Sequence, residues 1–164
     1  MRRLPTIIGA GLVAAATASA IAVTSGSAQA PGERTLTFVE RETNTFVLAD
    51  VPPLAGKHGS PSNGDTILFK NTVLDATGAT KLGTFEARCT LLHATKRFDG
   101  SRAVCDAAYT LGDGMITAET ATTFANKVTF AVTGGTGAYV GARGTDLTHN
   151  NADDSSTDTI TLLP

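Results

Sequence analysis

Glu40 is the residue of this sequence whose position best suits chemistry. It lies in residues 35–42, a stretch rich in Thr, Val, Phe and Leu that predicts a β-strand. Side chains alternate along a strand, so Leu36 and Phe38 share a face with Glu40. If that face is the core, its carboxyl group enters apolar surroundings, where its pKa is expected to rise and it becomes a candidate general acid or base. Two alternatives stay open: the strand is bulged, or Glu40 lies at the rim of the fold and pairs with Arg88, Arg97 or Lys70.

The two cysteines are placed to form a disulfide. Cys89 lies on a predicted strand, residues 81–93, and alternation puts it on the apolar face. Cys105 lies on the next predicted strand, residues 102–111. A hairpin of these strands centred near residue 97 would set the cysteines opposite each other, with Cβ atoms about 4.5–5.5 Å apart. Local twist can close that distance to a disulfide.

Other groupings of reactive residues are weaker. The three histidines are too scattered for a zinc signature: His58, His93 and His149. Three acids near the C-terminus could hold calcium loosely, although a solvated acidic turn is the favoured interpretation: Asp153, Asp154 and Asp158. There is no Gly-x-Ser-x-Gly nucleophile motif. The sequence predicts neither a metal site nor a cofactor.

Short strands must position these residues. Eight are predicted, at 35–42, 65–74, 81–93, 102–111, 115–122, 127–133, 140–148 and 157–163. No window shows an apolar period of 3.6 residues, so helices are not expected. Turn-forming clusters such as Ser62-Asn63-Gly64-Asp65 separate the strands, and residues 49–64 are expected to form a long loop. The pattern predicts an all-β fold, a sandwich or a closed antiparallel barrel.

The first thirty residues have the order of a secretory signal. Arg2 and Arg3 precede an apolar stretch, residues 7–23, and the segment ends Ser27-Ala28-Gln29-Ala30, a suitable site for signal peptidase. A retained membrane anchor is the alternative, but the apolar stretch is shorter than the ~20 residues that span a bilayer. The arginine pair leaves both the general secretory and the twin-arginine route open. An exported chain is expected to oxidise its two cysteines.

Length and charge limit the function classes. Of 164 residues, 13 are basic and 15 acidic, for a net charge of −2. Without residues 1–30 the chain keeps 11 basic and 15 acidic residues, which argues against nucleic-acid binding. Residues 31–164 are expected to form one secreted domain with no stable membrane insertion, since no later apolar run could cross a bilayer.

Several segments resemble the allene oxide cyclase and dirigent protein superfamily. The most specific is the glycine-rich segment 130–144, FAVTGGTGAYVGARG. Further pieces match in order: Phe38-Val39-Glu40, then residues 64–75, then 83–89 followed by 109–114. The resemblance covers about residues 35–148 and implies an eight-stranded antiparallel β-barrel. Within Gly134-Gly135-Thr136-Gly137 we expect a tight bulged turn with positive φ, because no helix pattern follows it as a phosphate loop would require.

The family resemblance also implies a function and a site. Family members confine a small apolar or conjugated molecule in the barrel and guide its cyclisation or coupling, which needs no cofactor. Residue by residue, the buried acid of the plant cyclase matches Glu40, its pocket Asn matches Asn71 and its pocket Cys matches Cys89. On the matching segments, Phe38, Phe69 and Tyr109 are expected to contact the ligand.

Departures from the family pattern separate two hypotheses. Glu42 replaces an Asn, Thr122 stands where a pocket Tyr is expected, and a family Pro has no counterpart near residue 49. A disulfide would also remove the thiol of Cys89. Allene oxide cyclase activity is therefore disfavoured, which leaves either another cyclase or isomerase using Glu40, or a non-catalytic barrel that binds a ligand or serves a structural role. A homo-oligomer is compatible with both. An open cavity holding Glu40 and Asn71 would favour the first hypothesis, and a lumen filled by Phe and Leu the second.

Overall fold

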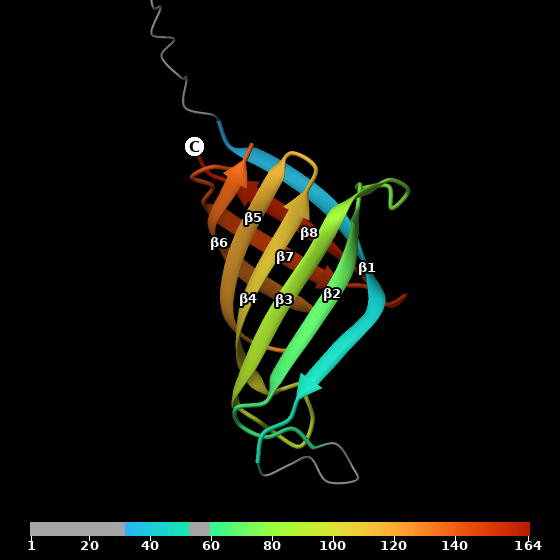
Figure 1. Cartoon of the computed structure of the whole chain (residues 1–164), viewed down its shortest axis with the longest axis vertical. Coiled ribbons are helices and arrows are strands. Elements are labelled where there is room, and N and C mark those ends of the chain that lie inside the picture. The colour runs from blue at the N-terminus through green and yellow to red at the C-terminus, as the bar shows by residue number, and fades with distance from the viewer. Residues whose placement is uncertain (1–31, 53–59) are drawn as a thin grey trace, which may run out of the picture.

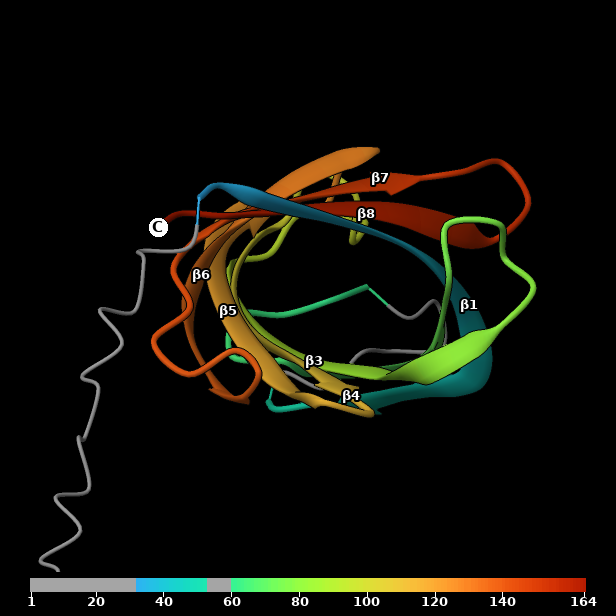
Figure 2. The ribbon, with the colours of Figure 1, turned by 90° about the horizontal axis from the view of Figure 1, so that it is seen from above.

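The protein forms a closed barrel of eight antiparallel strands (Figures 1 and 2). The structure is a computed structural model that describes residues 32–52 and 60–164. The strands are β1 Arg34–Ala49, β2 Thr66–Leu74, β3 Lys81–His93, β4 Arg102–Leu111, β5 Gly114–Thr123, β6 Lys127–Gly137, β7 Gly144–Asn150 and β8 Ser155–Leu162. Each strand pairs with the next, and β8 closes the barrel on β1. This confirms the all-β, eight-stranded fold predicted from the sequence.

Two sequence-based expectations lie partly or wholly outside the described residues. The predicted signal segment, residues 1–30, is one, and the middle of the predicted 49–64 loop is the other. Across the ranges that the structure covers, no helix is long and apolar enough to cross a membrane.

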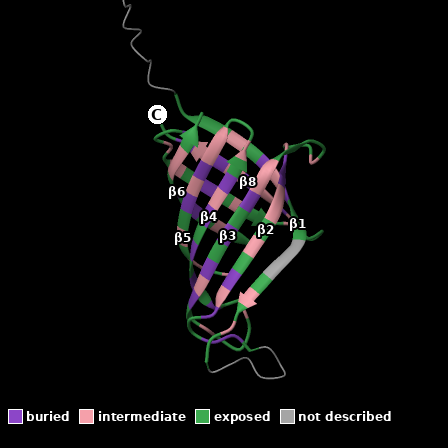
Figure 3. Cartoon of the chain, viewed as in Figure 1, coloured by how far each residue is buried: buried purple, intermediate pink, exposed green. Residues whose placement is uncertain are grey.

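Strand alternation separates the inside of the barrel from the outside (Figure 3). On β8, for example, Ser156, Asp158, Ile160 and Leu162 are buried while the intervening threonines are partly exposed. The outer face carries exposed ion pairs, among them Lys70–Glu86 and Arg88–Asp106.

The packed core extends along the barrel from Tyr109, near the β4–β5 connection, to Leu91 and Ala103, near the β3–β4 connection. We call the end that carries the β2–β3, β4–β5 and β6–β7 connections the closed end, and the opposite end the open end. In the core, Tyr109 is fully buried, with its ring centroid 5.9 Å from that of Phe38 and 4.9 Å from that of Phe85. Such aromatic packing fills the lumen around Tyr109.

The first strand is longer than predicted because it is bulged. β1 continues to Ala49, and its pairing with β2 shifts between Glu42 and Thr45. Phe38 and Glu40 are both buried before this shift. The sequence offered an inward Glu40 and a bulged strand as alternatives. Both occur, because Glu40 points inward in the first part of β1 and the bulge follows it.

The glycine-rich segment was placed wrongly. Gly134 and Gly135 lie within β6 rather than in a turn, and Gly137, with φ 59°, ends the strand. The expected bulge is present, since the β5–β6 register shifts between Thr117 and Ala118. A side chain at Gly135 would meet the Tyr139 carbonyl oxygen at 2.4 Å, so close backbone approach explains this glycine. The connection therefore runs through residues 138–143, and the strand predicted at 140–148 is β7, Gly144–Asn150.

Candidate functional site

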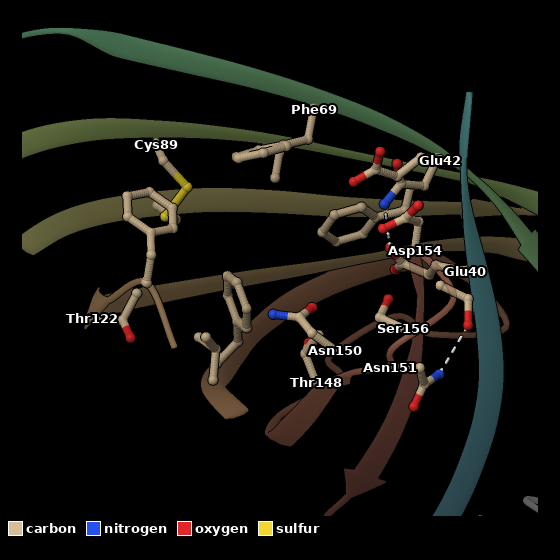
Figure 4. A pocket seen from close by; sticks show the side chains of 18 residues that line it. Glu40, Glu42, Phe69, Cys89, Thr122, Thr148, Asn150, Asn151, Asp154 and Ser156 are labelled. Atoms are coloured by element: carbon tan, nitrogen blue, oxygen red, sulfur yellow. Dashed lines mark hydrogen bonds between the residues drawn. A yellow bond between two sulfur atoms is a disulfide. The ribbon is translucent and has the colours of Figure 1, made fainter. Parts of the chain in front are cut away.

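A cavity of about 310 Å³ opens at the open end of the barrel. In Figure 4 the labelled residues separate into two groups, with Cys89 and Thr122 on one side and Glu40, Asp154 and Ser156 on the other. The apolar wall is made largely of phenylalanines and the disulfide: Phe69, Phe85, Phe124, Phe130, Cys89 and Cys105. The polar wall comes from β1, β2, β7, β8 and the β7–β8 connection: Glu40, Glu42, Asn71, Thr148, Asn150, Asn151, Asp154, Ser155 and Ser156.

Glu40 reaches the cavity from a buried position on β1. Only 2% of its surface is exposed, and Asn71 Nδ2 on β2 donates a 2.8 Å hydrogen bond to Glu40 Oε2. Glu40 Oε1 accepts no hydrogen bond from a donor group among the described residues, but the Glu40 carboxyl group shares a side-chain hydrogen bond with the carboxyl group of Asp158. Two buried carboxyl groups in contact can hold one proton between them, and Glu40 carries this pair to the cavity wall.

No cation neutralises Glu40 in the way one sequence alternative proposed. Lys70 pairs with Glu86 on the outer face, Arg88 with Asp106, and Arg97 with Asp99. That alternative is wrong because Lys70 and Arg88 lie on the outer face of their strands and Arg97 is exposed in the β3–β4 connection.

The surroundings of Glu40 favour its protonated form. Burial raises the pKa of Glu40 well above its ordinary value, and the nearby charges of Asp158 and Asp146 raise it further. The Asn71 hydrogen bond opposes this rise by stabilising the carboxylate. Glu40 therefore holds its proton at a pH where an exposed glutamate has lost it.

Two further buried acids lie behind Glu40, and sequence reasoning missed both. Asp146 on β7 accepts a 2.7 Å hydrogen bond from the Tyr109 hydroxyl, and burial together with the charge of Asp158 raises its pKa to about 7. Asp158 on β8 is fully buried, which raises its pKa as well. The acidic-turn interpretation is thus wrong for Asp158, although Asp153 is exposed. Ile160 is an apolar inner-face residue of its strand, and strict alternation would have placed Asp158, two residues earlier, on the same face.

The predicted site residues do not all reach the cavity. Glu40, Asn71 and Phe69 line it, whereas Phe38 and Tyr109 are packed in the core and are not among the lining residues. The disulfide is confirmed: Cys89 and Cys105 are directly paired on β3 and β4, with Cα atoms 4.0 Å apart. Because both sulfurs are bonded, the cavity wall has no thiol at Cys89. Thr122, the residue in place of the family's Tyr, lines the cavity.

The described part of the chain contains no cluster of three or more His, Cys, Asp or Glu residues arranged to hold a metal ion.

Comparison with known proteins identifies the family. The family model described as "Allene oxide cyclase barrel like domain" matches residues 39–161, most of the chain. The chain therefore belongs to the allene oxide cyclase barrel-like family. No curated protein matches the sequence significantly.

Solved structures share the fold at low identity. A pyocyanin demethylase aligns at a TM-score of 0.65 and 21% identity, covering 79% of this chain and 99% of that one. The pterocarpan synthase dirigent protein PsPTS1 aligns at a TM-score of 0.59 and 12% identity, covering 82% and 95%. AbnU, an exo-specific intermolecular Diels-Alderase, aligns at 0.58 and 17% identity, covering 80% and 98%. At these identities the likeness establishes a common barrel.

Proposed function

We propose that this protein binds a small conjugated molecule in its cavity and promotes a cyclisation, isomerisation or related rearrangement, with Glu40 transferring a proton. The observation that carries the proposal is the position of Glu40, a buried acid on the wall of an open cavity. A general acid or base must reach the ligand and must titrate near the working pH. Glu40 lines the cavity, and burial raises its pKa from the ordinary value in the direction that the second requirement needs.

Asn71 is the positioning residue in this proposal. Its amide donates a 2.8 Å hydrogen bond to Glu40 Oε2 and so fixes the orientation of the carboxyl group on the cavity wall. The phenylalanine wall supplies the surface on which a flat conjugated molecule would stack, and confinement between the two walls would restrict its conformation. No cofactor is needed for a rearrangement that moves only protons and carbon–carbon bonds.

The similar structures support a small-molecule role. They are a pyocyanin demethylase, an exo-specific intermolecular Diels-Alderase and a pterocarpan synthase dirigent protein, names that all denote activities on small molecules. The site of action is proposed to be extracellular, since the N-terminal segment has the order of an export signal and the domain carries a disulfide. N-terminal sequencing of protein recovered from the culture medium should then begin close to residue 31.

The test compares three forms of the full chain against an extract of the culture that produces the protein. Wild type is expected to retain at least one compound and to convert it, as followed by mass spectrometry. Thr122→Trp, which fills the apolar side of the cavity, should lose retention, and Glu40→Gln should keep retention but lose conversion. Retention without conversion by wild type would favour the non-catalytic binding barrel. No retention, or retention that Thr122→Trp does not change, would refute the proposal.

A further inference from the structure

Three acidic side chains are buried side by side on the inner face of adjacent strands. Glu40 on β1 pairs with Ser156 on β8, so Asp158, two residues further along β8, is its diagonal neighbour on the same face. Asp158 in turn pairs with Thr148 on β7, which makes Asp146 its diagonal neighbour on that side. All three acids are at most 2% exposed, and no Lys, Arg or His is buried among the described residues. Without a buried cation, the cluster limits charge repulsion by keeping protons.

The members of this cluster differ in what they can reach. Glu40 lines the cavity, whereas Asp158 and Asp146 are not among its lining residues. The carboxyl groups of Glu40 and Asp158 share a side-chain hydrogen bond. A carboxyl group can donate such a bond only when it is protonated, so the position of one proton decides which of the two is the acid.

The hydrogen-bond donors around these two carboxyl groups are unequal. Three hydroxyl groups interact with Asp158 and stabilise its carboxylate, which opposes the rise in its pKa that burial causes: those of Thr148, Tyr109 and Ser156. Glu40 receives one comparable donor, the Asn71 amide at 2.8 Å. The better place for the negative charge is therefore Asp158, and the better place for the shared proton is Glu40.

We propose that Glu40 and Asp158 work as a pair with one proton, in which Glu40 holds the proton toward the cavity and Asp158 is the positioning residue that keeps it there. The inference rests on the proposed function, because it states in which form Glu40 meets the ligand. Glu40 acts first as an acid: its O–H bond breaks, and the proton bonds to a lone pair on an oxygen or nitrogen atom of the ligand.

The pair also determines what must follow this first proton transfer. Donation leaves two carboxylates in contact, and their repulsion favours the return of a proton to Glu40 from another position of the ligand. The ligand then neither gains nor loses a proton overall, and no electrons are exchanged with the protein. This is the balance of an isomerisation or a cyclisation.

The ionisable groups that face the pair fix the sign of its pH dependence. They are acids and one phenol: Asp146 on β7, Tyr109 on β4, and at the cavity Glu42 on β1 and Asp154 in the β7–β8 connection. In the described part of the chain, β3, β5 and β6 bury no ionisable side chain. Since no cation compensates the charge of Asp158, removing that charge should lower the pKa of Glu40.

The experiment is a carboxyl carbon NMR titration of the full chain, with the two signals assigned through the backbone. In wild type we expect both signals to respond at each of two titration steps that belong to the pair. Between the two steps the Glu40 signal should be that of a protonated carboxyl group and the Asp158 signal that of a carboxylate. Asp158→Asn should lower the pKa of Glu40 by about one unit or more. Asp106→Asn makes the same change on the exposed face of β4 and should leave that pKa unchanged.

The outcomes separate this inference from the proposed function. The pair is wrong if Glu40 titrates in a step that Asp158 does not sense, if Asp158→Asn behaves like Asp106→Asn, or if the proton resides on Asp158. The proposed function stands in each case as long as the pKa of Glu40 remains raised, whereas a Glu40 that titrates at its ordinary value overturns both. If Asp158→Asn does not fold, the wild-type titration decides alone, because the shared steps and the position of the proton are measured in it.

Discussion

Replacing Asp146 with asparagine should stabilise the protein above pH 7 and leave its stability near pH 4 unchanged. Asp146 is 1% exposed, and its pKa is raised from 3.8 to about 7, first by burial and then by the charge of Asp158. Below pH 3.8 the group is protonated in both folded and unfolded states and contributes nothing. Between pH 3.8 and 7 the unfolded state loses its proton first, so the free energy of unfolding falls as pH rises.

The structure sets the size of this effect. Each pKa unit corresponds to about 1.4 kcal/mol, so a rise from 3.8 to about 7 lowers the free energy of unfolding by about 4 kcal/mol once the pH exceeds 7. Asparagine removes this loss and keeps an oxygen that can accept the hydrogen bond of Tyr109. A difference of that size is a large part of the 5–15 kcal/mol that typically stabilises a domain.

Urea unfolding of the full chain, followed by far-ultraviolet circular dichroism from pH 4 to 9, measures the effect. The curves of wild type and Asp146→Asn should meet near pH 4 and separate progressively up to about pH 7. Asp106→Asn is the matched control, because Asp106 is an exposed partner of Arg88 and its loss should change stability by only about 0–1 kcal/mol. Parallel curves for wild type and Asp146→Asn across the whole range would refute the buried-acid interpretation.

Three further changes test the parts of the barrel that hold the cavity. Replacing both Cys89 and Cys105 with alanine should lower the free energy of unfolding by about 3 kcal/mol in urea titrations, because the bond closes a loop with a sequence separation of 16; equal stability of the variant and the oxidised protein would contradict this. Gly135→Ala should lower the melting temperature strongly, since the added Cβ meets backbone oxygens at 2.4 and 2.6 Å, whereas Gly112→Ala, with open space around it, should change little. Tyr109→Phe should cost about 1–3 kcal/mol and raise the pKa of the aspartate that accepts its hydroxyl, measured by carboxyl carbon NMR; an unchanged pKa would show that this hydrogen bond is unimportant.

The sequence predicted the barrel and half of the polar site because alternation was informative on the first four strands. Leu36 and Phe38 fixed the inner face of β1 and carried Glu40 inward with them. The midpoint of the β3–β4 hairpin placed Cys89 opposite Cys105, as their pairing confirms. In both cases the apolar neighbours on one face of the strand indicated that the residue of interest points into the barrel.

The remaining part of the site could not be predicted for two physical reasons. Asp158 lies among threonines and near Asp153, so its surroundings suggested a solvated turn, although its strand buries every second residue. Asp146 was obscured because its strand was expected to start at residue 140, whereas close packing of Gly135 against Tyr139 delays the strand to Gly144.

The most direct test of the central claim is a carboxyl carbon NMR titration of Glu40 in the full chain, with its signal assigned by comparison with Glu40→Gln. The account predicts that Glu40 stays protonated well above the pH at which an exposed glutamate ionises. A Glu40 that titrates near its ordinary 4.5 would contradict the account.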